Sequence, residues 1–283
     1  MRTVETIEEA VAAAAELRKN GATLALVPTM GNLHQGHLTL VREARKLADH
    51  TAVSIFVNPL QFNNREDLRT YPRTPEADLA LLEAEGADLV FLPRPEIMYP
   101  QGLESHTTVF VPGLSDMLEG ALRPGHFKGV TTVVCKLFNI FRPDCAMFGL
   151  KDFQQVAVLK KMVRDMCLGV RIVEVPIVRD EGGLALSSRN GLLSEEEKIR
   201  ARKISQRMFA VRDAILAGRR DYDALAAEAA ADLNQVEGFA TDSVDIVNAD
   251  TLEKAAPDTR RVAVLMAVKV GPTRLIDSVA FDL

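Results

Sequence analysis

Two histidines three positions apart, with a glycine between them, are the clearest candidates for chemistry in this chain. His34 and His37 lie in the run Pro28-Thr29-Met30-Gly31-Asn32-Leu33-His34-Gln35-Gly36-His37. Residues three apart share one face of a helix, and each imidazole can donate a hydrogen bond to a phosphate oxygen. Gly31 and Gly36 let the backbone turn tightly and let a ligand approach without meeting a Cβ atom. The pattern predicts a phosphate site, although a helix cap is the simpler alternative.

The segments on either side place this run at a junction between a strand and a helix. Residues 24–27 are short, apolar and bounded by Gly21 and Pro28, which is typical of a buried strand. Residues 37–49 carry apolar side chains at helical spacing, so they predict an amphipathic helix. The N-terminus of a helix has unpaired N–H groups and a partial positive charge, which favour a bound phosphate.

A second segment, residues 53–62, ends a predicted buried strand with two side-chain amides, Asn58 and Gln61. Asn58 precedes a proline and is most simply a turn residue. Gln61 has no comparable role in a turn. Because an amide both donates and accepts hydrogen bonds, Gln61 could recognise a hydroxyl or a carboxylate of a polar substrate.

A third segment, residues 148–155, follows another predicted strand and carries Lys151, Asp152 and Gln155. Lys151 could oppose the charge of a phosphate. Asp152 could hold a magnesium ion, although capping the helix that starts at Phe153 is the simpler role. If the helix begins there, Gln155 would face the same crevice as Gln61.

Two loops add further polar groups. Residues 180–191 hold Ser187, Ser188 and Arg189 between glycines, which suits a loop that closes over phosphates. A solvated surface loop is the alternative. Residues 119–127 add Arg123 and His126, a weaker indication when taken alone.

The composition restricts the class of protein. The chain has 283 residues, 47% hydrophobic and 26% charged, so it can bury a sizeable core in one large or two modest domains. A net charge of −5 without a long basic run argues against a nucleic-acid surface. Cys135, Cys145 and Cys167 lack metal-ligand spacing and are expected to be reduced thiols. The absence of a signal segment and of an apolar run of about twenty residues predicts a soluble, cytoplasmic protein with no membrane partner.

Strand-like and helical segments alternate in the first part of the chain, which predicts an α/β fold with a mostly parallel sheet. Strands are expected at residues 24–27, 52–57, 88–92, 145–148 and 171–178, and helices at 6–19, 37–49, 75–85, 130–140 and 153–166. Ligands of such sheets bind beyond the carboxyl ends of the strands, where residues 29–37, 58–62 and 149–152 would meet. The Pro- and Gly-rich tract 99–128 is expected to be irregular.

After residue 178 the pattern changes. Ser194 and Glu197 fit a capping box that opens a helix to about residue 216, and a second helix follows from Asp221. Strands are expected at 243–247, 261–270 and 273–277. We therefore expect two domains, residues 1–177 and a smaller α+β domain of residues 178–283.

Taken together, the motifs resemble the pantothenate synthetase (pantoate–β-alanine ligase) family of the HxGH nucleotidyltransferase superfamily. The segments PTMGNLHQGH, SIFVNPLQF, YPRT, LEGALRPGHFKGV, GLKDFQQ and GLALSSRNGLL occur in the family's order and spacing, from about residue 24 to residue 277. The resemblance implies a Rossmann-like N-terminal domain, a smaller C-terminal lid domain and a cytoplasmic homodimer. It also implies an ATP-dependent ligase that joins (R)-pantoate to β-alanine through a pantoyl-adenylate. Such a ligase uses Mg²⁺, releases AMP and pyrophosphate, and serves pantothenate and coenzyme A biosynthesis.

The resemblance further implies roles for single residues. His37, as the proton donor, would act with His34, Lys151 and Arg189 in catalysis. Gln61 and Gln155 would bind pantoate, and Gln61 would also lie near the β-alanine site. Leu150 departs from the family, which usually has Glu or Gln at that position. No protein ligand of Mg²⁺ is assigned, and the ion is expected to be bridged mainly by the ATP phosphates. The implied ATP-binding residues are Met30, Gly31, Asn32, Leu33, His34, Gln35, Gly36, His37, Gly149, Leu150, Lys151, Asp152, Val178, Leu186, Ser187, Ser188 and Arg189.

Three other functions would use similar phosphate motifs. One is a nucleotidyltransferase whose product keeps the AMP. Another is an enzyme similar to an aminoacyl-tRNA synthetase, which the acidic charge and the missing anticodon-type module disfavour. The third is a nucleotide-binding regulator without catalysis.

Overall fold

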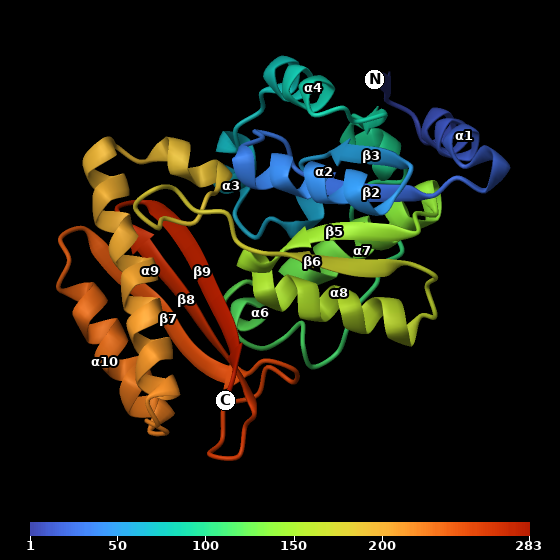
Figure 1. Cartoon of the computed structure of the whole chain (residues 1–283). Coiled ribbons are helices and arrows are strands. Elements are labelled where there is room, and N and C mark those ends of the chain that lie inside the picture. The colour runs from blue at the N-terminus through green and yellow to red at the C-terminus, as the bar shows by residue number, and fades with distance from the viewer. The chain divides into compact units, whose positions relative to one another are not determined.

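The computed structural model describes all 283 residues, which form two compact units. The first unit consists of residues 1–149 and 154–175, and the second of residues 150–153 and 176–283 (Figure 1). The first is built on a six-stranded sheet and the second on a separate three-stranded sheet. The predicted fold class, a mostly parallel α/β sheet followed by a smaller α+β part, is confirmed.

The sheet of the first unit is parallel throughout, in the order β1-β4-β3-β2-β5-β6. Its strands alternate with helices along the chain, as expected for right-handed crossovers. The strands are β1 (Arg2–Val4), β2 (Leu24–Thr29), β3 (His50–Ile55), β4 (Leu89–Phe91), β5 (Cys145–Gly149) and β6 (Arg171–Val175).

Successive residues of β2 belong to two different hydrophobic clusters, because side chains alternate between the two faces of a strand. Leu24 and Leu26 pack with apolar residues of α1 (Ile7–Leu17), α7 (His126–Phe141) and α8 (Phe153–Asp165). Ala25 and Val27 pack with those of α2 (Gln35–Leu47) and α4 (Pro75–Ala84). Helices therefore cover both faces of this sheet. The shorter helices of this unit are α3 (Arg65–Thr70), α5 (Pro95–Met98) and α6 (Glu119–Leu122), and its 3₁₀ turns are η1 (Lys19–Gly21) and η2 (Pro59–Gln61). A further 3₁₀ turn, η3 (Leu150–Asp152), belongs to the second unit.

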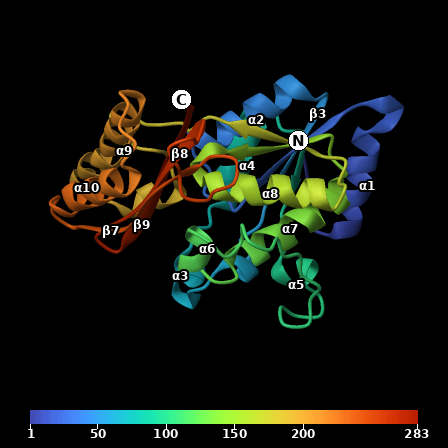
Figure 2. The ribbon, with the colours of Figure 1, turned by 90° about the horizontal axis from the view of Figure 1, so that it is seen from below.

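The second unit pairs an antiparallel sheet with two long helices. The sheet has the order β7 (Phe239–Asn248), β8 (Arg261–Val270), β9 (Thr273–Asp282). Helices α9 (Glu195–Leu216) and α10 (Tyr222–Asn234) lie side by side along one face of it in both views (Figures 1 and 2). The predicted capping box of Ser194 and Glu197 opens α9, and the 3₁₀ turn η4 (Ser188–Leu192) precedes it.

Several elements differ from the sequence-based expectations. Strand β1, which pairs with β4 in parallel, was not predicted. Helix α7 begins at His126, four residues before the predicted start, inside the tract expected to be irregular. Strands β7 and β9 are longer than predicted. No helix has the length and apolar character that a crossing of the bilayer requires.

Candidate functional site

Three predicted segments of the first unit follow neighbouring strands. Residues 30–37 follow β2, Asn58 and Gln61 follow β3, and Gly149 ends β5. Because β3, β2 and β5 are adjacent and parallel, their carboxyl ends lie along one edge of the sheet. The chain leaves β2 toward β3 on one side, while β5 lies on the other, and ligands of open α/β sheets bind at such a change of direction.

The two histidines at the start of α2 cap the helix with their own rings. His34 is the N-cap residue, and its Nδ1 accepts the Gly36 N–H at 3.1 Å. His37 Nδ1 accepts the His34 N–H at 3.3 Å, and the two ring centroids are 4.0 Å apart. Since each Nδ1 accepts a hydrogen bond, each neutral ring carries its proton on Nε2. Both residues can therefore offer an Nε2–H donor to an anion.

This arrangement corrects one expectation from the sequence. The N–H groups at the start of α2 were expected to be unpaired, but those of His34 and Gly36 already have imidazole partners. The imidazole rings thus replace a ligand as the partners of those two backbone groups.

The turn before these histidines is held by Asp78, which the sequence did not single out. Gly31 and Asn32 have positive φ angles of 81° and 50°. The buried Asp78 carboxylate of α4 accepts the N–H groups of Asn32 and Leu33 at 2.9 and 2.8 Å, and Thr74 donates to it at 3.1 Å. A Cβ at position 31 would lie 3.0 Å from the Asp78 carboxylate. The glycine thus permits both the backbone conformation and the close approach.

Gln61 lies in the turn η2 and its amide is bonded at both ends. Asn58 Nδ2 donates to Gln61 Oε1 at 3.0 Å, and Gln61 Nε2 lies 3.2 Å from the sulfur of Met30. The structure thereby brings Gln61 next to the predicted ATP segment. Asn58 is also the N-cap of η2 through Leu60 N–H, as expected for a turn residue, so it has both roles.

Helix α7 packs against the turn η2 that carries Gln61. The buried His126 ring donates from Nδ1 to the Gln61 backbone carbonyl at 2.9 Å, while Nε2 accepts from Arg123 at 3.3 Å. A Cβ at Gly129 would lie 2.5 Å from the backbone of Leu60 and 2.6 Å from the Gln61 nitrogen. Glycine at 129 is what lets the helix contact this turn.

Two adjacent glutamines at the start of α8 have different surroundings. The buried Gln154 donates to the carbonyls of Leu114 and Met117, both at 2.8 Å, and accepts the Glu119 N–H at 3.0 Å. Its amide is used entirely by the backbone of a neighbouring loop. Gln155, the predicted pantoate ligand, is half-buried.

Three predicted ATP residues, Leu150, Lys151 and Asp152, belong to the second unit. Lys151 and Asp152 form an ion pair at 3.1 Å. The backbone carbonyl of Leu150 accepts a hydrogen bond from Ser278 of β9 at 2.7 Å. The turn is therefore bound to β9 through the backbone of Leu150, and this contact does not depend on the side chain at position 150.

The remaining predicted ATP residues form a hairpin and the turn after it. Val178 and Leu186 face each other, since the Leu186 N–H donates to the Val178 carbonyl at 2.9 Å. Ser187 is the N-cap of η4 and accepts the Arg189 N–H at 3.3 Å. Ser188 is the first residue of that turn.

Two ion pairs hold the hairpin in the second unit. Arg179 makes bonds of 2.6 and 2.8 Å to the buried carboxylate of Asp277 in β9. Arg202 of α9 binds the Asp180 carboxylate at 2.9 and 3.1 Å. Burial alone would raise the pKa of Asp180, but hydrogen bonds from Arg202 and from backbone N–H groups hold that pKa below its usual value.

The structure contains no group of three or more His, Cys, Asp or Glu side chains that could hold a metal ion. Asp152 is a single carboxylate already paired with Lys151. One carboxylate is too few ligands for a metal site built by the protein alone. It fits a cation whose other ligands are the phosphate oxygens of a bound nucleotide.

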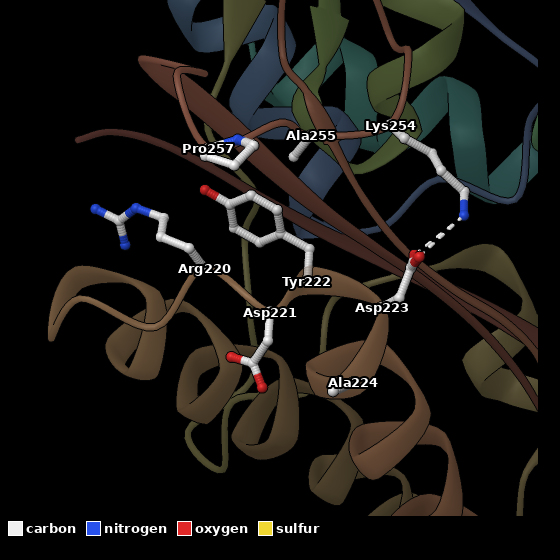
Figure 3. Close-up of a pocket in the computed structure, with 8 residues that line it drawn as sticks. All are labelled: Arg220, Asp221, Tyr222, Asp223, Ala224, Lys254, Ala255 and Pro257. Carbon is white, nitrogen blue, oxygen red and sulfur yellow. Dashed lines mark hydrogen bonds and ion pairs between the residues drawn. The ribbon is translucent and has the colours of Figure 1, made fainter.

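A hollow of about 300 Å³ in the second unit is lined by none of the predicted site residues. Tyr222, the first residue of α10, lines it together with Ala255 and Pro257, and the ion pair of Asp223 and Lys254 lies beside them (Figure 3). The Tyr222 hydroxyl is buried and has no hydrogen-bond partner.

Comparisons with known proteins of similar sequence and similar structure all point to one family. Residues 2–280 match the family described as Pantoate-beta-alanine ligase. The pantothenate synthetase of Aeromonas hydrophila is 56% identical over 261 residues, covering 92% of this chain and 91% of that protein. A crystal structure of pantothenate synthetase from Thermus thermophilus has 42% identity and a TM-score of 0.91, with 99% of both chains covered. The pantoate-beta-alanine ligase of Francisella tularensis, crystallised with beta-gamma ATP and beta-alanine, has 33% identity and a TM-score of 0.82, covering 99% of this chain and 97% of that chain.

Proposed function

Because this chain belongs to the pantoate-beta-alanine ligase family, we infer that it condenses (R)-pantoate with β-alanine in an ATP-dependent reaction. The observation that carries this inference is the family match over nearly the whole chain, from residue 2 to residue 280. The complex of the Francisella relative supports ATP and β-alanine as ligands of the same fold.

The reaction proceeds in two steps. A pantoate carboxylate oxygen attacks the α-phosphorus of ATP and pyrophosphate leaves, which gives the pantoyl-adenylate. The β-alanine amine then attacks the acyl carbon, an amide forms, and AMP leaves with a proton lost from the amine. Holding the adenylate beside the amine supplies much of the second step by proximity.

The first unit supplies donors for the growing negative charge of the first step. His34 and His37, each with its proton on Nε2, donate to phosphoryl oxygens, and such preorganised donors lower the barrier. The support for this role is the pair of Nδ1 caps, which fix both rings by the backbone. Residues Met30, Gly31, Asn32, Leu33, Gln35, Gly36 and Gly149 form the rest of the proposed ATP contacts in this unit.

Gln61 and Gln155 are proposed to hold pantoate. Gln61 is buried and fixed by Asn58, which suits recognition of one orientation of a small polar acid.

The second unit supplies cations and small donors. Lys151 and Arg189 oppose phosphate charge, and Ser187 and Ser188 donate to phosphate oxygens. Leu150, Asp152, Val178 and Leu186 complete the proposed ATP contacts. Bound Mg²⁺ would neutralise phosphate charge, and Asp152 is the carboxylate of this segment that could contribute to holding it. We further propose that the protein acts as a cytoplasmic homodimer.

Mass spectrometry of the products formed from ATP, Mg²⁺, pantoate and β-alanine tests the function. We expect pantothenate, AMP and pyrophosphate in equal amounts. A product that keeps the AMP would identify a nucleotidyltransferase, and ATP binding without pantoate-dependent pyrophosphate release would identify a regulator. Lys151→Ala and His37→Ala should lower pyrophosphate release with pantoate alone, and near wild-type turnover would remove that residue from the mechanism.

A further inference from the structure

The buried phenol of Tyr99 is bonded to the amide that holds Gln61. Tyr99 is 3% exposed, and its hydroxyl donates to Asn58 Oδ1 at 2.7 Å. Asn58 itself is 1% exposed. Burial raises the pKa of Tyr99 above its ordinary value, so the phenol stays protonated and acts as a donor.

The Tyr99 ring is enclosed by groups that fix its position. Lys136 of α7 donates to the Met98 carbonyl and to His106 Nε2, the latter at 3.2 Å. Its ammonium lies 5.2 Å from the Tyr99 ring centroid, and the His106 ring meets Tyr99 edge-on at 4.9 Å. The centroid of the Phe56 ring lies 6.1 Å from that of the Tyr99 ring. Packing therefore fixes the ring and the position of the hydroxyl oxygen next to Asn58.

The hydrogen bonds of Asn58 have only one consistent polarity. Oδ1 accepts from Tyr99 and from the Leu60 N–H at 3.3 Å, so Nδ2 must be the donor end. Nδ2 donates to the Gly129 carbonyl at 3.1 Å and to Gln61 Oε1 at 3.0 Å. Of these four bonds, the one from Tyr99 is the shortest.

This orientation of the Asn58 amide determines the orientation of the Gln61 amide. Its Oε1 is occupied by Asn58, so its Nε2 is the end left for another partner. In the structure that partner is the thioether of Met30 at 3.2 Å, a weak acceptor that an oxygen would readily replace.

We propose that Tyr99 is a positioning residue that acts through Asn58 to present the Gln61 amide by its N–H₂ group, so that Gln61 recognises an acceptor oxygen of the substrate. The inference rests on the proposed function, in which that substrate is pantoate, whose carboxylate and hydroxyl oxygens are acceptors. Tyr99 touches no substrate in this scheme, and its effect passes entirely through Gln61.

The test is a double-mutant cycle with Tyr99→Phe, Gln61→Ala and the combined variant, scored by pantoate-dependent AMP formation. Tyr99→Phe keeps the ring and removes one hydrogen bond. We expect the KM for pantoate to rise about 3- to 10-fold, with the KM for ATP and the melting temperature nearly unchanged. In the Gln61→Ala background the same substitution should have no further effect on pantoate. Tyr222→Phe is the matched control, because it removes a buried tyrosine hydroxyl that has no partner.

Each outcome decides a separate question. A wild-type enzyme without pantoate-dependent AMP formation overturns the proposed function and this inference with it. If wild type and Gln61→Ala behave as expected but Tyr99→Phe leaves the pantoate KM unchanged, or acts equally in both backgrounds, the inference alone is wrong. If Tyr99→Phe does not fold, Gln61→Glu decides, since it can keep the Asn58 contact but replaces the outward donor by an acceptor. An unchanged pantoate KM in Gln61→Glu would then overturn the inference.

Discussion

The backbone N–H of His34 donates to Nδ1 of His37, and this bond determines which nitrogen of the neutral His37 ring carries the proton. A ring that accepts at Nδ1 has its proton at Nε2. Nδ1 of His37 thus caps the helix, and Nε2–H is the donor for an anion. Substitutions can remove either function and keep the other.

Substitutions at His37 should separate the two roles. The Oδ1 of asparagine can replace the Nδ1 acceptor, whereas the Nε2 of glutamine can replace the Nε2–H donor. We expect His37→Asn to keep the free energy of unfolding and to lower kcat for AMP formation about 100-fold or more. His37→Gln should keep more activity and lose about 1 kcal/mol of stability. Urea unfolding with steady-state kinetics measures both, and the reverse ranking in either assay would contradict the assignment.

Loss of the Asp78 carboxylate should disturb the turn at Gly31 and Asn32. Asp78→Asn leaves one acceptor oxygen for two backbone N–H groups, so one part-buried donor loses its partner. We expect a loss of about 1–3 kcal/mol in the free energy of unfolding and a higher KM for ATP. Glu76→Gln, the same change at an exposed position of α4, is the control and should change neither quantity.

A side chain at position 129 should push α7 away from η2. Gly129→Ala places a Cβ about 2.5 Å from the Leu60 backbone, which can be relieved only by moving backbone atoms. We expect a loss of about 1–3 kcal/mol in stability and a raised KM for pantoate. Gly169→Ala, at a glycine with open space around the Cβ position, should be neutral or slightly stabilising. Equal effects of the two substitutions would show that the contact with Leu60 is unimportant.

The imidazole of His106 should make the protein less stable at mildly acidic pH. Burial, and next the charge of Lys136, hold the pKa of His106 below its ordinary value of 6.5. The unfolded chain therefore takes up this proton at a higher pH than the folded protein does. The contribution of His106 to stability is present above about pH 6.5 and is lost as the pH falls through the lower folded pKa. His106→Gln should reduce the drop in the urea midpoint between pH 8 and pH 5, and an identical drop in both proteins would contradict this.

The elements of the fold were predictable wherever apolar periodicity was strong. Strands β2 and β8 and helices α2, α8 and α9 lie close to their predicted ranges. Strand β1 was missed because three residues, of which only Val4 is buried, give no pattern without knowledge of their partner β4. The start of α7 was missed because Gly125 and Gly129 are typical of irregular chain. Gly129 is helical here since the helix must approach Leu60, a contact that lies 69 positions back along the sequence.

The candidate site was predictable in its motifs but not in its supports. The sequence indicated His34, His37 and Gln61 from residue type and position after strands. Asp78 gave no signal, because an acidic residue in the first turn of a helix is ordinarily a solvent-exposed partner of the helix dipole. Its role as an acceptor for Asn32 and Leu33 depends on the packing of α4 against a distant turn. Tyr99 was undetectable for the same reason, since its partner Asn58 is 41 positions away.

The four-residue segment 150–153 has a consequence for dividing the protein into fragments. It belongs to the second unit, although the rest of helix α8, from Gln154 onward, and strand β6 belong to the first. A fragment that begins at residue 178 would lack Leu150, and Ser278 of β9 would lose its hydrogen-bond acceptor. A single cut in the chain therefore cannot separate the two units. Lys151 and Arg189, 38 positions apart in the sequence, both belong to the second unit.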